Sequence, residues 1–121
     1  MSRSELYSTY SVEPAMVVAF KPNRMLDTDS VDRVADSLKD LLARADEDAF
    51  VFDFSGVGYL SSRALGLLLG IHRDLARDGR GLKLAGLSDE NREVFRVTKL
   101  DAVFDIYADA TAAIKAFQTR E

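Results

Sequence analysis

The chain has 121 residues, of which 16 are Lys or Arg and 20 are Asp or Glu, so its formal net charge is −4. With 47% hydrophobic and 30% charged residues it has the composition of a globular protein, and its length suits one domain spanning residues 1–121. It contains no Cys and one His, which excludes a zinc site of the Cys/His type and thiol catalysis. An acidic chain without a basic stripe is not expected to bind nucleic acid.

The sequence also argues against membrane insertion. No apolar run approaches the roughly 18 residues that a membrane-spanning helix needs. The first residues lack the apolar stretch of a secretory signal peptide, so we expect a cytoplasmic protein with no membrane span. The classes that remain are a protein-binding module and a small enzyme that works with carboxylates and hydroxyls.

Two strands are predicted at the start of the chain. Residues 7–12 alternate aromatic and β-branched side chains with Ser and Thr, as in a half-exposed strand, and residues 16–20 form an apolar run. A Glu-Pro pair separates them, so we expect an antiparallel hairpin at one side of a sheet. Asp27 and its polar neighbours can then cap a helix over residues 31–45, where apolar residues recur at three- and four-residue intervals.

The middle of the chain predicts a buried strand followed by a helix. Residues 49–54 are apolar except for Asp53, which is typical of a central strand covered on both faces. A glycine-containing loop leads to a helix over residues 62–77. Gly66 and Gly70 lower the helix propensity of this segment, and close packing or flexibility is the reason we expect for both.

A further strand and helix follow. We expect a short strand over residues 82–85 and, after a capping serine, a helix over residues 89–98. The spacing of apolar residues predicts that this helix packs Val94, Phe95 and Val97 inward.

The last part of the chain predicts a strand over residues 102–107 and a terminal helix that Asp109 caps. The order is therefore β-β-α-β-α-β-α-β-α, with about five strands and four helices. Strands separated by helices of this length imply parallel crossovers. The sequence thus predicts an α/β fold, a mixed sheet covered by helices.

The loop over residues 55–62 is the first candidate site. It follows the central strand and opens a helix, where free backbone N–H groups and the helix dipole favour an anion. Ser61 and Ser62 place hydroxyls at that end, and a phosphate on either would lie beside Arg63. The simpler interpretation is that one of the two serines only caps the helix.

Asp27 and Asp53 form a second candidate. If both lie at one rim of the sheet near Ser62, their carboxylates suggest metal binding or acid–base chemistry. Asp27 is equally suited to capping a helix, and Asp53 to accepting hydrogen bonds from the amides of residues 56–58, so we favour structural roles. His72 lies about ten residues into its helix, roughly 15 Å from the serines, which is too far for a nucleophile–base pair.

Two weaker patterns carry no site. The glycines of the serine loop match neither the phosphate-binding loop of nucleoside triphosphatases nor the dinucleotide fingerprint. Arg92, Arg96 and Lys99 form a modest basic patch that is more typical of a solvated helix face than of a nucleic-acid surface. We therefore expect no catalytic residue, no cofactor and no metal.

The run FVFDFSGVGYLSSRALGLL, residues 50–68, combines a buried strand that ends in Asp-Phe-Ser with a turn that contains Val57 and Tyr59 and with two serines at a helix start. This order of features resembles the signature of the STAS domains, which are found in bacterial anti-sigma factor antagonists and related regulators. In that family a buried strand ends in Asp-Leu-Ser, and a turn with Val and an aromatic residue leads to Asp-Ser-Ser-Gly at a helix start. Met25-Leu26-Asp27 is similar to the family's Gly-x-Leu-Asp before the first helix. The resemblance extends over nearly the whole chain.

This resemblance implies a non-catalytic regulator whose partner is a serine kinase that is also an anti-sigma factor. In the family the partner binds the serine loop and the adjacent helix. Phosphorylation of a serine in Asp-Ser-Ser-Gly ends the binding, because it puts a charge of about −1.5 to −2 into a complementary interface. The residues expected to contact the partner are Ser61, Ser62, Arg63, Ala64 and Gly66, and those expected to shape the loop are Asp27 and Asp53.

The sequence departs from the family motif at its centre. Aligned on the following helix, Asp-Ser-Ser-Gly becomes Ser61-Ser62-Arg63-Ala64, so Arg63 stands where the family has a usual phosphate acceptor. Two hypotheses follow. Either Ser62 or Ser61 accepts the phosphate, with Arg63 close enough to pair with it, or the domain binds its partner constitutively with Arg63 as a fixed positive charge.

Two other functions fit the sequence. STAS domains also serve transporters, so the chain is compatible with a soluble component of a transporter system that acts in trans. A different class is a nucleotide-binding protein or small enzyme that uses Asp27, Asp53 and Ser62. The sequence identifies neither the partner nor the oligomeric state, and a homodimer is compatible with it.

Overall fold

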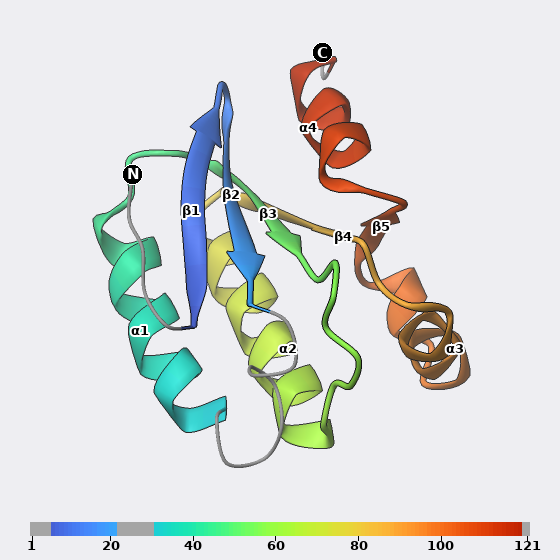
Figure 1. Ribbon diagram of the computed structural model, residues 1–121. Helices are drawn as coiled ribbons and strands as arrows, with labels where there is room; N and C mark the ends of the chain where they lie inside the picture. The colour runs from blue at the N-terminus through green and yellow to red at the C-terminus, as the bar shows by residue number, and fades with distance from the viewer. Residues whose placement is uncertain (1–5, 22–30, 120–121) are drawn as a thin grey trace.

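Five strands form a mixed sheet in which they lie side by side in the order of the chain, β1-β2-β3-β4-β5 (Figure 1). The computed structural model describes residues 6–21 and 31–119. The strands are β1 (Tyr7–Val12), β2 (Ala15–Phe20), β3 (Ala49–Asp53), β4 (Gly81–Ala85) and β5 (Asp105–Tyr107). The helices are α1 (Val31–Arg44), α2 (Ser62–Arg77), α3 (Asp89–Val97) and α4 (Ala110–Gln118), with a 3-10 helix η1 (Leu100–Ala102).

The pairing of the strands confirms the predicted α/β fold. β1 and β2 form the expected antiparallel hairpin, whereas β2, β3, β4 and β5 pair in parallel. The element order matches the predicted one, and the second long helix has the predicted bounds, Ser62–Arg77. Asp109 caps α4 as expected, because its Oδ1 accepts a hydrogen bond from the Ala112 amide at 2.9 Å.

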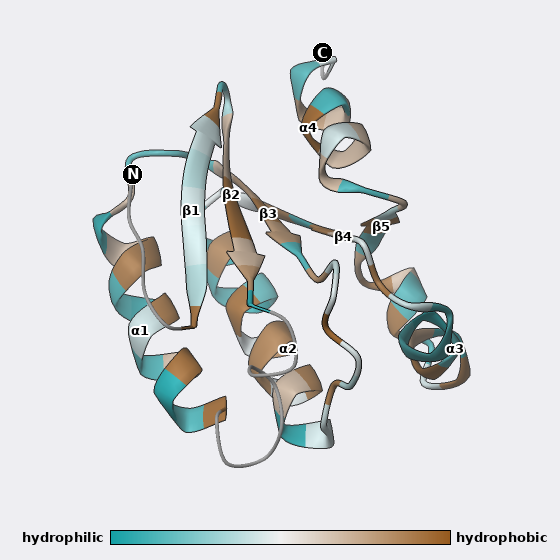
Figure 2. Ribbon diagram, in the orientation of Figure 1, coloured by the Kyte–Doolittle hydropathy of each residue, from teal (hydrophilic) through white to brown (hydrophobic). Residues whose placement is uncertain are grey.

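The helices cover the two faces of the sheet unequally. One face packs against the apolar stripes of α1 and α2, and Phe95 of α3 joins the same cluster. The other face packs against α4, which contributes Ala113, Ile114 and Phe117. In Figure 2 the polar residues of α1 and α2 alternate with the apolar stripes that produce this packing.

β3 is the centre of both clusters. Phe50 and Phe52 point into the cluster beneath α1 and α2, whereas Ala49 and Val51 point toward α4, and all four are buried. A strand covered on both faces needs apolar residues at successive positions, which explains the unbroken run seen in the sequence. The carboxyl end of β3 therefore emerges from the buried core, and the candidate site begins there.

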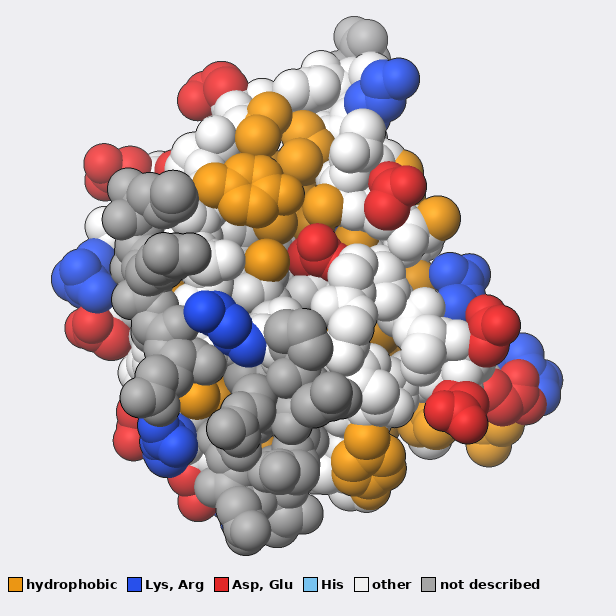
Figure 3. All heavy atoms as spheres, viewed as in Figure 1, with side chains coloured by type: hydrophobic (Ala, Val, Ile, Leu, Met, Phe, Trp, Pro, Cys, Tyr) orange, Lys and Arg blue, Asp and Glu red, His pale blue; other side chains and the backbone are white. Residues whose placement is uncertain are grey.

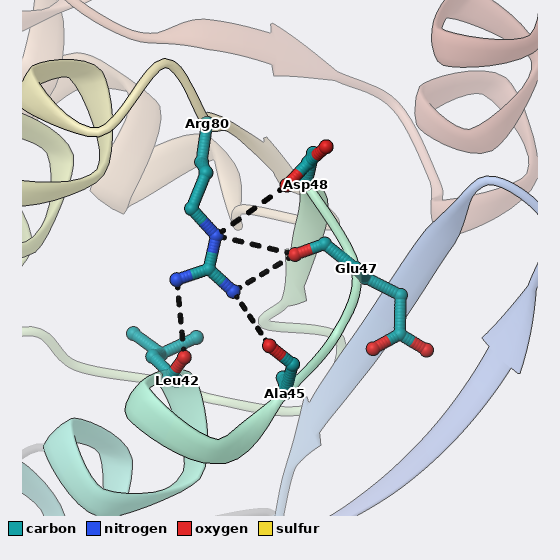
Figure 4. Close-up of polar contacts among 5 residues, drawn as sticks. All are labelled: Leu42, Ala45, Glu47, Asp48 and Arg80. Atoms are coloured by element: carbon teal, nitrogen blue, oxygen red, sulfur yellow. Dashed lines mark hydrogen bonds and ion pairs between the residues drawn. The ribbon is translucent and has the colours of Figure 1, made fainter.

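Arg80 joins the end of α1 to the sheet (Figure 4). Its guanidinium donates hydrogen bonds to the backbone carbonyls of Leu42, Ala45 and Glu47 at 2.8–3.2 Å and lies 5.0 Å from the centre of the Phe50 ring. The carbonyls at the end of a helix have no partners within the helix, so one arginine satisfies several of them at once. This fork ties the C-terminal end of α1 to the start of β4, at the end of the sheet away from the serine loop.

The C-terminal region differs from the sequence prediction in two ways. The strand expected over residues 102–107 is wrong for its first half, where residue 102 ends η1 and residues 103–104 form a turn, and only Asp105–Tyr107 pairs with β4. Lys99 has a left-handed backbone with φ of 65°, and the amides that follow bond to nearby carbonyls rather than to a neighbouring strand. Phe104 then turns into the core against Phe95 and His72.

The packing of α3 also differs from its prediction. Phe95 is fully buried as expected, but Val94 and Val97 are exposed. The buried face of α3 instead includes Asn91, four residues before Phe95. Apolar spacing alone identified the helix, but it could not identify the buried face, because a polar residue occupies part of that face.

Candidate functional site

The loop between β3 and α2 is anchored by buried apolar side chains. The Phe54 amide donates to the Ala85 carbonyl at 2.9 Å, and the Val57 amide donates to the Phe54 carbonyl at the same distance. Phe54, Val57 and Leu60 are all buried. With these three anchors in the core, the residues between them are held outward in defined positions. Figure 1 shows the loop as the green segment that runs from β3 to the start of α2.

Asp53 fixes the first turn of this loop. Its Oδ1 accepts hydrogen bonds from the Ser55 amide at 3.0 Å and the Ser55 hydroxyl at 2.7 Å. The expectation that it bonds the amides of residues 56–58 is therefore wrong in detail, because both donors belong to Ser55. Asp53 has the loop-shaping geometry that the sequence suggested, but its partner lies one residue earlier in the loop.

Gly86, in the loop after β4, completes this contact and was missed as a site residue by the sequence prediction. A Cβ built on Gly86 would lie 2.5 Å from the Ser55 hydroxyl oxygen and 2.8 Å from Asp53 Oδ1. Its φ of 74° also favours glycine. The two loops can approach this closely only because position 86 has no side chain.

The two serines have different roles at the start of α2. Ser61 is the N-cap, with its Oγ accepting a hydrogen bond from the Ala64 amide at 3.1 Å, and only 3% of the residue is exposed. Ser62 follows on the surface. The capping interpretation is thus confirmed for Ser61. Ala64 is buried, so its side chain does not lie on the surface that we expected to contact a partner.

Arg63 pairs with Asp32 of α1. One guanidinium nitrogen donates to Asp32 Oδ1, and the two side chains stay 55% and 70% exposed. Asp32 lies in the first turn of α1 and Arg63 in the first turn of α2, so the ion pair joins the starts of the two helices. The sequence placed Arg63 on the exposed surface, but it did not reveal this partner 31 residues away.

Tyr59 is the most exposed large apolar residue in the described part of the chain, at 66%. It lies between the buried anchors Val57 and Leu60, so its backbone is held while its ring faces solvent. Gly66, one turn into α2, is exposed as well, and nothing among the described atoms lies within 4 Å of a Cβ built there. Within residues 6–21 and 31–119, close packing is therefore not the reason for this glycine.

A second exposed apolar patch lies on β1. Tyr10 and Val12 are 41% and 38% exposed, and Figure 3 shows hydrophobic side chains gathered over this end of β1 and β2. Partial burial raises the pKa of the Tyr10 hydroxyl above its usual value, and the nearby Asp53 carboxylate raises it further. The Tyr10 hydroxyl is therefore neutral at physiological pH and offers a hydrogen-bonding group rather than a charge.

The remaining sequence candidates do not join the serine loop. His72 is half-buried in α2 and its ring lies 5.1 Å from the Phe104 ring. Arg96 of the basic patch pairs with Glu93 on the same helix. Asp27 lies outside the described residues. Within residues 6–21 and 31–119, no group of three or more His, Asp or Glu side chains is arranged to hold a metal ion.

The arrangement at the start of α2 has the elements of a recognition surface. It offers an exposed aromatic ring, an exposed hydroxyl and an arginine, all held by a loop with buried anchors. Aromatic residues and arginine are the side chains that most often dominate the energy of protein–protein contacts. No helix in the described part of the chain is long and apolar enough to cross a membrane.

Comparison with known proteins shows which sequences and folds this chain is similar to. The sequence model of the STAS domain matches residues 9–113. An anti-sigma-factor antagonist (STAS) domain protein from Planctomyces limnophilus superposes with a TM-score of 0.84 at 21% identity, over 93% of this chain and 98% of the other. An anti-sigma factor antagonist from Mycobacterium paratuberculosis gives a TM-score of 0.79 at 21% identity, over 91% of each chain.

A third structure is the phosphorylated form of SpoIIAA, a cell fate determinant of Bacillus. It superposes with a TM-score of 0.68 at 19% identity, over 92% of this chain and 98% of that one. At these identities the similarity establishes the fold.

Proposed function

The chain belongs to the STAS domain family, whose sequence model matches most of its length, and from this membership we propose that it is a non-catalytic, cytoplasmic regulator of the anti-sigma factor antagonist type. Its partner is a protein, a serine kinase that is also an anti-sigma factor. The partner binds the loop between β3 and α2 together with the exposed face of α2.

The observation that carries this proposal is the exposed ring of Tyr59 between two buried anchors. Exposing a large aromatic side chain to water is unfavourable unless a partner covers it, and a fixed backbone reduces the entropy lost on binding. Val57 and Leu60 provide that fixed backbone. Tyr59 therefore extends the contact surface that the family resemblance suggested, which included Ser62, Arg63 and Gly66.

The exposed face of α2 suits the approach of a second chain. Gly66 leaves open space beside the helix, so a partner backbone or side chain can come close to it. The charge of Arg63 is balanced by Asp32, so the surface at this point carries little net charge. A partner that contacts Tyr59 and Gly66 would bury an aromatic ring at the centre and leave the ion pair near the rim.

For control by phosphorylation we favour Ser62 over Ser61. The Ser61 hydroxyl is buried and already accepts a hydrogen bond from the Ala64 amide, so modifying it would remove the cap of α2. The Ser62 hydroxyl lies on the surface at the same helix start. A phosphate there would put up to two negative charges beside Tyr59 and weaken an interface formed by the neutral loop.

The proposal is tested by titrating the purified chain into each purified serine kinase/anti-sigma factor encoded in the same genome, by calorimetry. We expect one of them to bind, and we expect Tyr59→Ala to weaken that binding at least about tenfold, which corresponds to roughly 1.4 kcal/mol. Tyr10→Ala is the matched control, because it removes the same ring from the other exposed apolar patch, and it should change the affinity less than about twofold. Binding that is insensitive to Tyr59→Ala would contradict the proposed surface.

Phosphorylation is tested with the kinase that binds. We expect it to incorporate one phosphate into the chain, to incorporate none into Ser62→Ala, and to bind the phosphorylated chain more weakly. Undiminished labelling of Ser62→Ala would exclude Ser62 as the acceptor. If a kinase binds the chain tightly but transfers no phosphate to it, the result would instead support the hypothesis that the domain binds its partner constitutively.

A further inference from the structure

The ion pair between Arg63 and Asp32 joins α2 to α1. It connects the first turns of the two helices, which lie at the same end of the molecule in Figure 1. Both side chains are more than half exposed, so water and salt weaken the pair. An exposed pair of this kind can exchange partners at small cost.

The start of α2 lacks an acidic side chain of its own. Residues 62–65 contain no Asp or Glu, so the positive end of the helix dipole has no negative side chain in its first turn. Ser61 satisfies the Ala64 amide, whereas the amides of Ser62 and Arg63 have no acceptor within the helix. A new negative charge at Ser62 would thus lie beside two amides that have no acceptor within the helix and beside the neighbouring guanidinium.

We propose that a phosphoryl group on Ser62 takes the Arg63 guanidinium away from Asp32, so that modification of the serine also breaks the ion pair between the first turns of α1 and α2. The regulatory meaning of this exchange rests on the proposed function, since it presumes that a kinase modifies Ser62. In that step the Ser62 Oγ forms a bond to the γ-phosphorus of a nucleoside triphosphate, and the bond from this phosphorus to the β–γ bridging oxygen breaks. The nucleoside diphosphate leaves, and the hydroxyl proton passes to a base of the kinase.

The charges favour the phosphate over Asp32 as the partner of Arg63. A phosphoserine carries about −1.5 to −2 charges at neutral pH and three acceptor oxygens, against one negative charge on a carboxylate. Ser62 and Arg63 are consecutive, with Cα atoms about 3.8 Å apart, and although neighbouring side chains of a helix point in different directions, the long, exposed arginine side chain can turn toward the phosphate. The planar guanidinium can then bind two phosphate oxygens at once.

The exchange costs Asp32 less free energy than Arg63 gains by pairing with the phosphate. It lies in the first turn of α1, where the positive end of that helix dipole stabilises a carboxylate even without Arg63. The release of Arg63 therefore leaves Asp32 solvated and favourably placed, while the ion pair between the helices is lost and their apolar packing stays. The exchange would transmit a change at the serine loop to the start of α1, which the partner need not touch.

The test uses the full chain with phosphoserine encoded at position 62 and no kinase. The second ionisation of the phosphate, which has a pKa of about 6 in free phosphoserine, is followed by phosphorus NMR. We expect the chain with Arg63 to show a phosphate pKa about half a unit lower than Arg63→Gln, because an exposed positive charge favours the dianion. Arg77→Gln is the matched control, since it breaks the exposed Arg77–Asp74 pair at the other end of α2.

Competition with Asp32 is measured by a double-mutant cycle. Asp32→Asn should lower the phosphate pKa further in the chain with Arg63, because it frees the arginine, and should lower it less in the Arg63→Gln background. Equal effects of Asp32→Asn in the two backgrounds would overturn the exchange, as would identical phosphate pKa values with and without Arg63. This measurement needs no partner protein, so its outcome is independent of the calorimetric binding experiments. A negative result in either one does not contradict the proposal tested by the other.

Discussion

Gly86 offers a direct test of how the serine loop is held. In Gly86→Ala the new methyl group would lie 2.5 Å from the Ser55 hydroxyl oxygen, 2.8 Å from Asp53 Oδ1 and 2.9 Å from the Ser55 amide nitrogen. Since one of these atoms belongs to the backbone, the loop cannot relieve the contact by rotating a side chain. The variant should displace the first turn of the loop and disrupt the Asp53–Ser55 hydrogen bonds.

The loss in free energy of unfolding caused by Gly86→Ala has two parts, which a matched control separates. Gly79 has nearly the same φ as Gly86, 75° against 74°, but no described atom lies within 4 Å of a Cβ built there. Gly79→Ala should thus cost only the left-handed backbone conformation, about 1 kcal/mol. Gly86→Ala adds the steric contact, for a total of about 3 kcal/mol.

Urea unfolding followed by circular dichroism measures both variants. With an m-value of about 1.5 kcal/mol/M, the midpoint should fall by about 2 M for Gly86→Ala and by under about 1 M for Gly79→Ala. Equal losses in the two variants would refute the close contact between the loops. A loss in Gly86→Ala without any change in the amide signals of residues 53–56 would refute its link to the serine loop.

Two further predictions concern Arg80 and Tyr10. Arg80→Met keeps the side-chain length but leaves the carbonyls at the end of α1 without a donor, so it should lower the free energy of unfolding by about 2–3 kcal/mol. Arg77→Met, which removes an exposed ion pair, should lower it by less than about 0.5 kcal/mol. A similar loss in both variants would contradict the arrangement in Figure 4. Because its pKa is raised, Tyr10 stabilises the folded state fully below pH 10, its usual pKa in the unfolded chain, and this contribution is lost as the pH rises through the folded-state pKa. Ultraviolet titration of the wild type and of Tyr10→Phe should therefore assign Tyr10 a pKa above 10. Asp53→Asn should remove only part of this rise in pKa, because burial is its larger cause. A Tyr10 pKa at or below 10 would contradict the partial burial of its hydroxyl.

The parts of the fold that the sequence predicted well depend on local patterns. The bounds of α2 followed from its apolar spacing together with a serine at its start, and the cap of α4 followed from Asp109. The central position of β3 followed from an apolar run that only a strand covered on both faces explains. Such signals are complete within about fifteen residues, so no tertiary information is needed to interpret them.

The features that the sequence did not predict depend on contacts between distant segments. The Arg63–Asp32 pair joins two helix starts 31 residues apart, and the contact of Gly86 with Asp53 joins the ends of two strands. The exposure of Tyr59, Val94 and Val97 depends on which direction each backbone segment takes, and an apolar residue is usually predicted to be inside. The left-handed turn at Lys99 gave no signal, since lysine has no preference for that conformation.

The proposed surface also accounts for the departure of this chain from the family motif. Arg63 occupies a position where the family has a usual phosphate acceptor, and here it forms an ion pair instead. Ser62 then remains as the exposed hydroxyl, next to an arginine that can respond to its charge. The substitution thus changes the electrostatics of the loop without changing the loop's buried anchors.

The most direct measurement is an NMR titration of the isotope-labelled chain with the kinase that binds it. We expect the largest amide shifts within residues 58–67, which include Tyr59 and Gly66, and small shifts in β1 around Tyr10 and in α4. Shifts concentrated in β1 or α4, with the loop between β3 and α2 unchanged, would contradict the proposed binding surface.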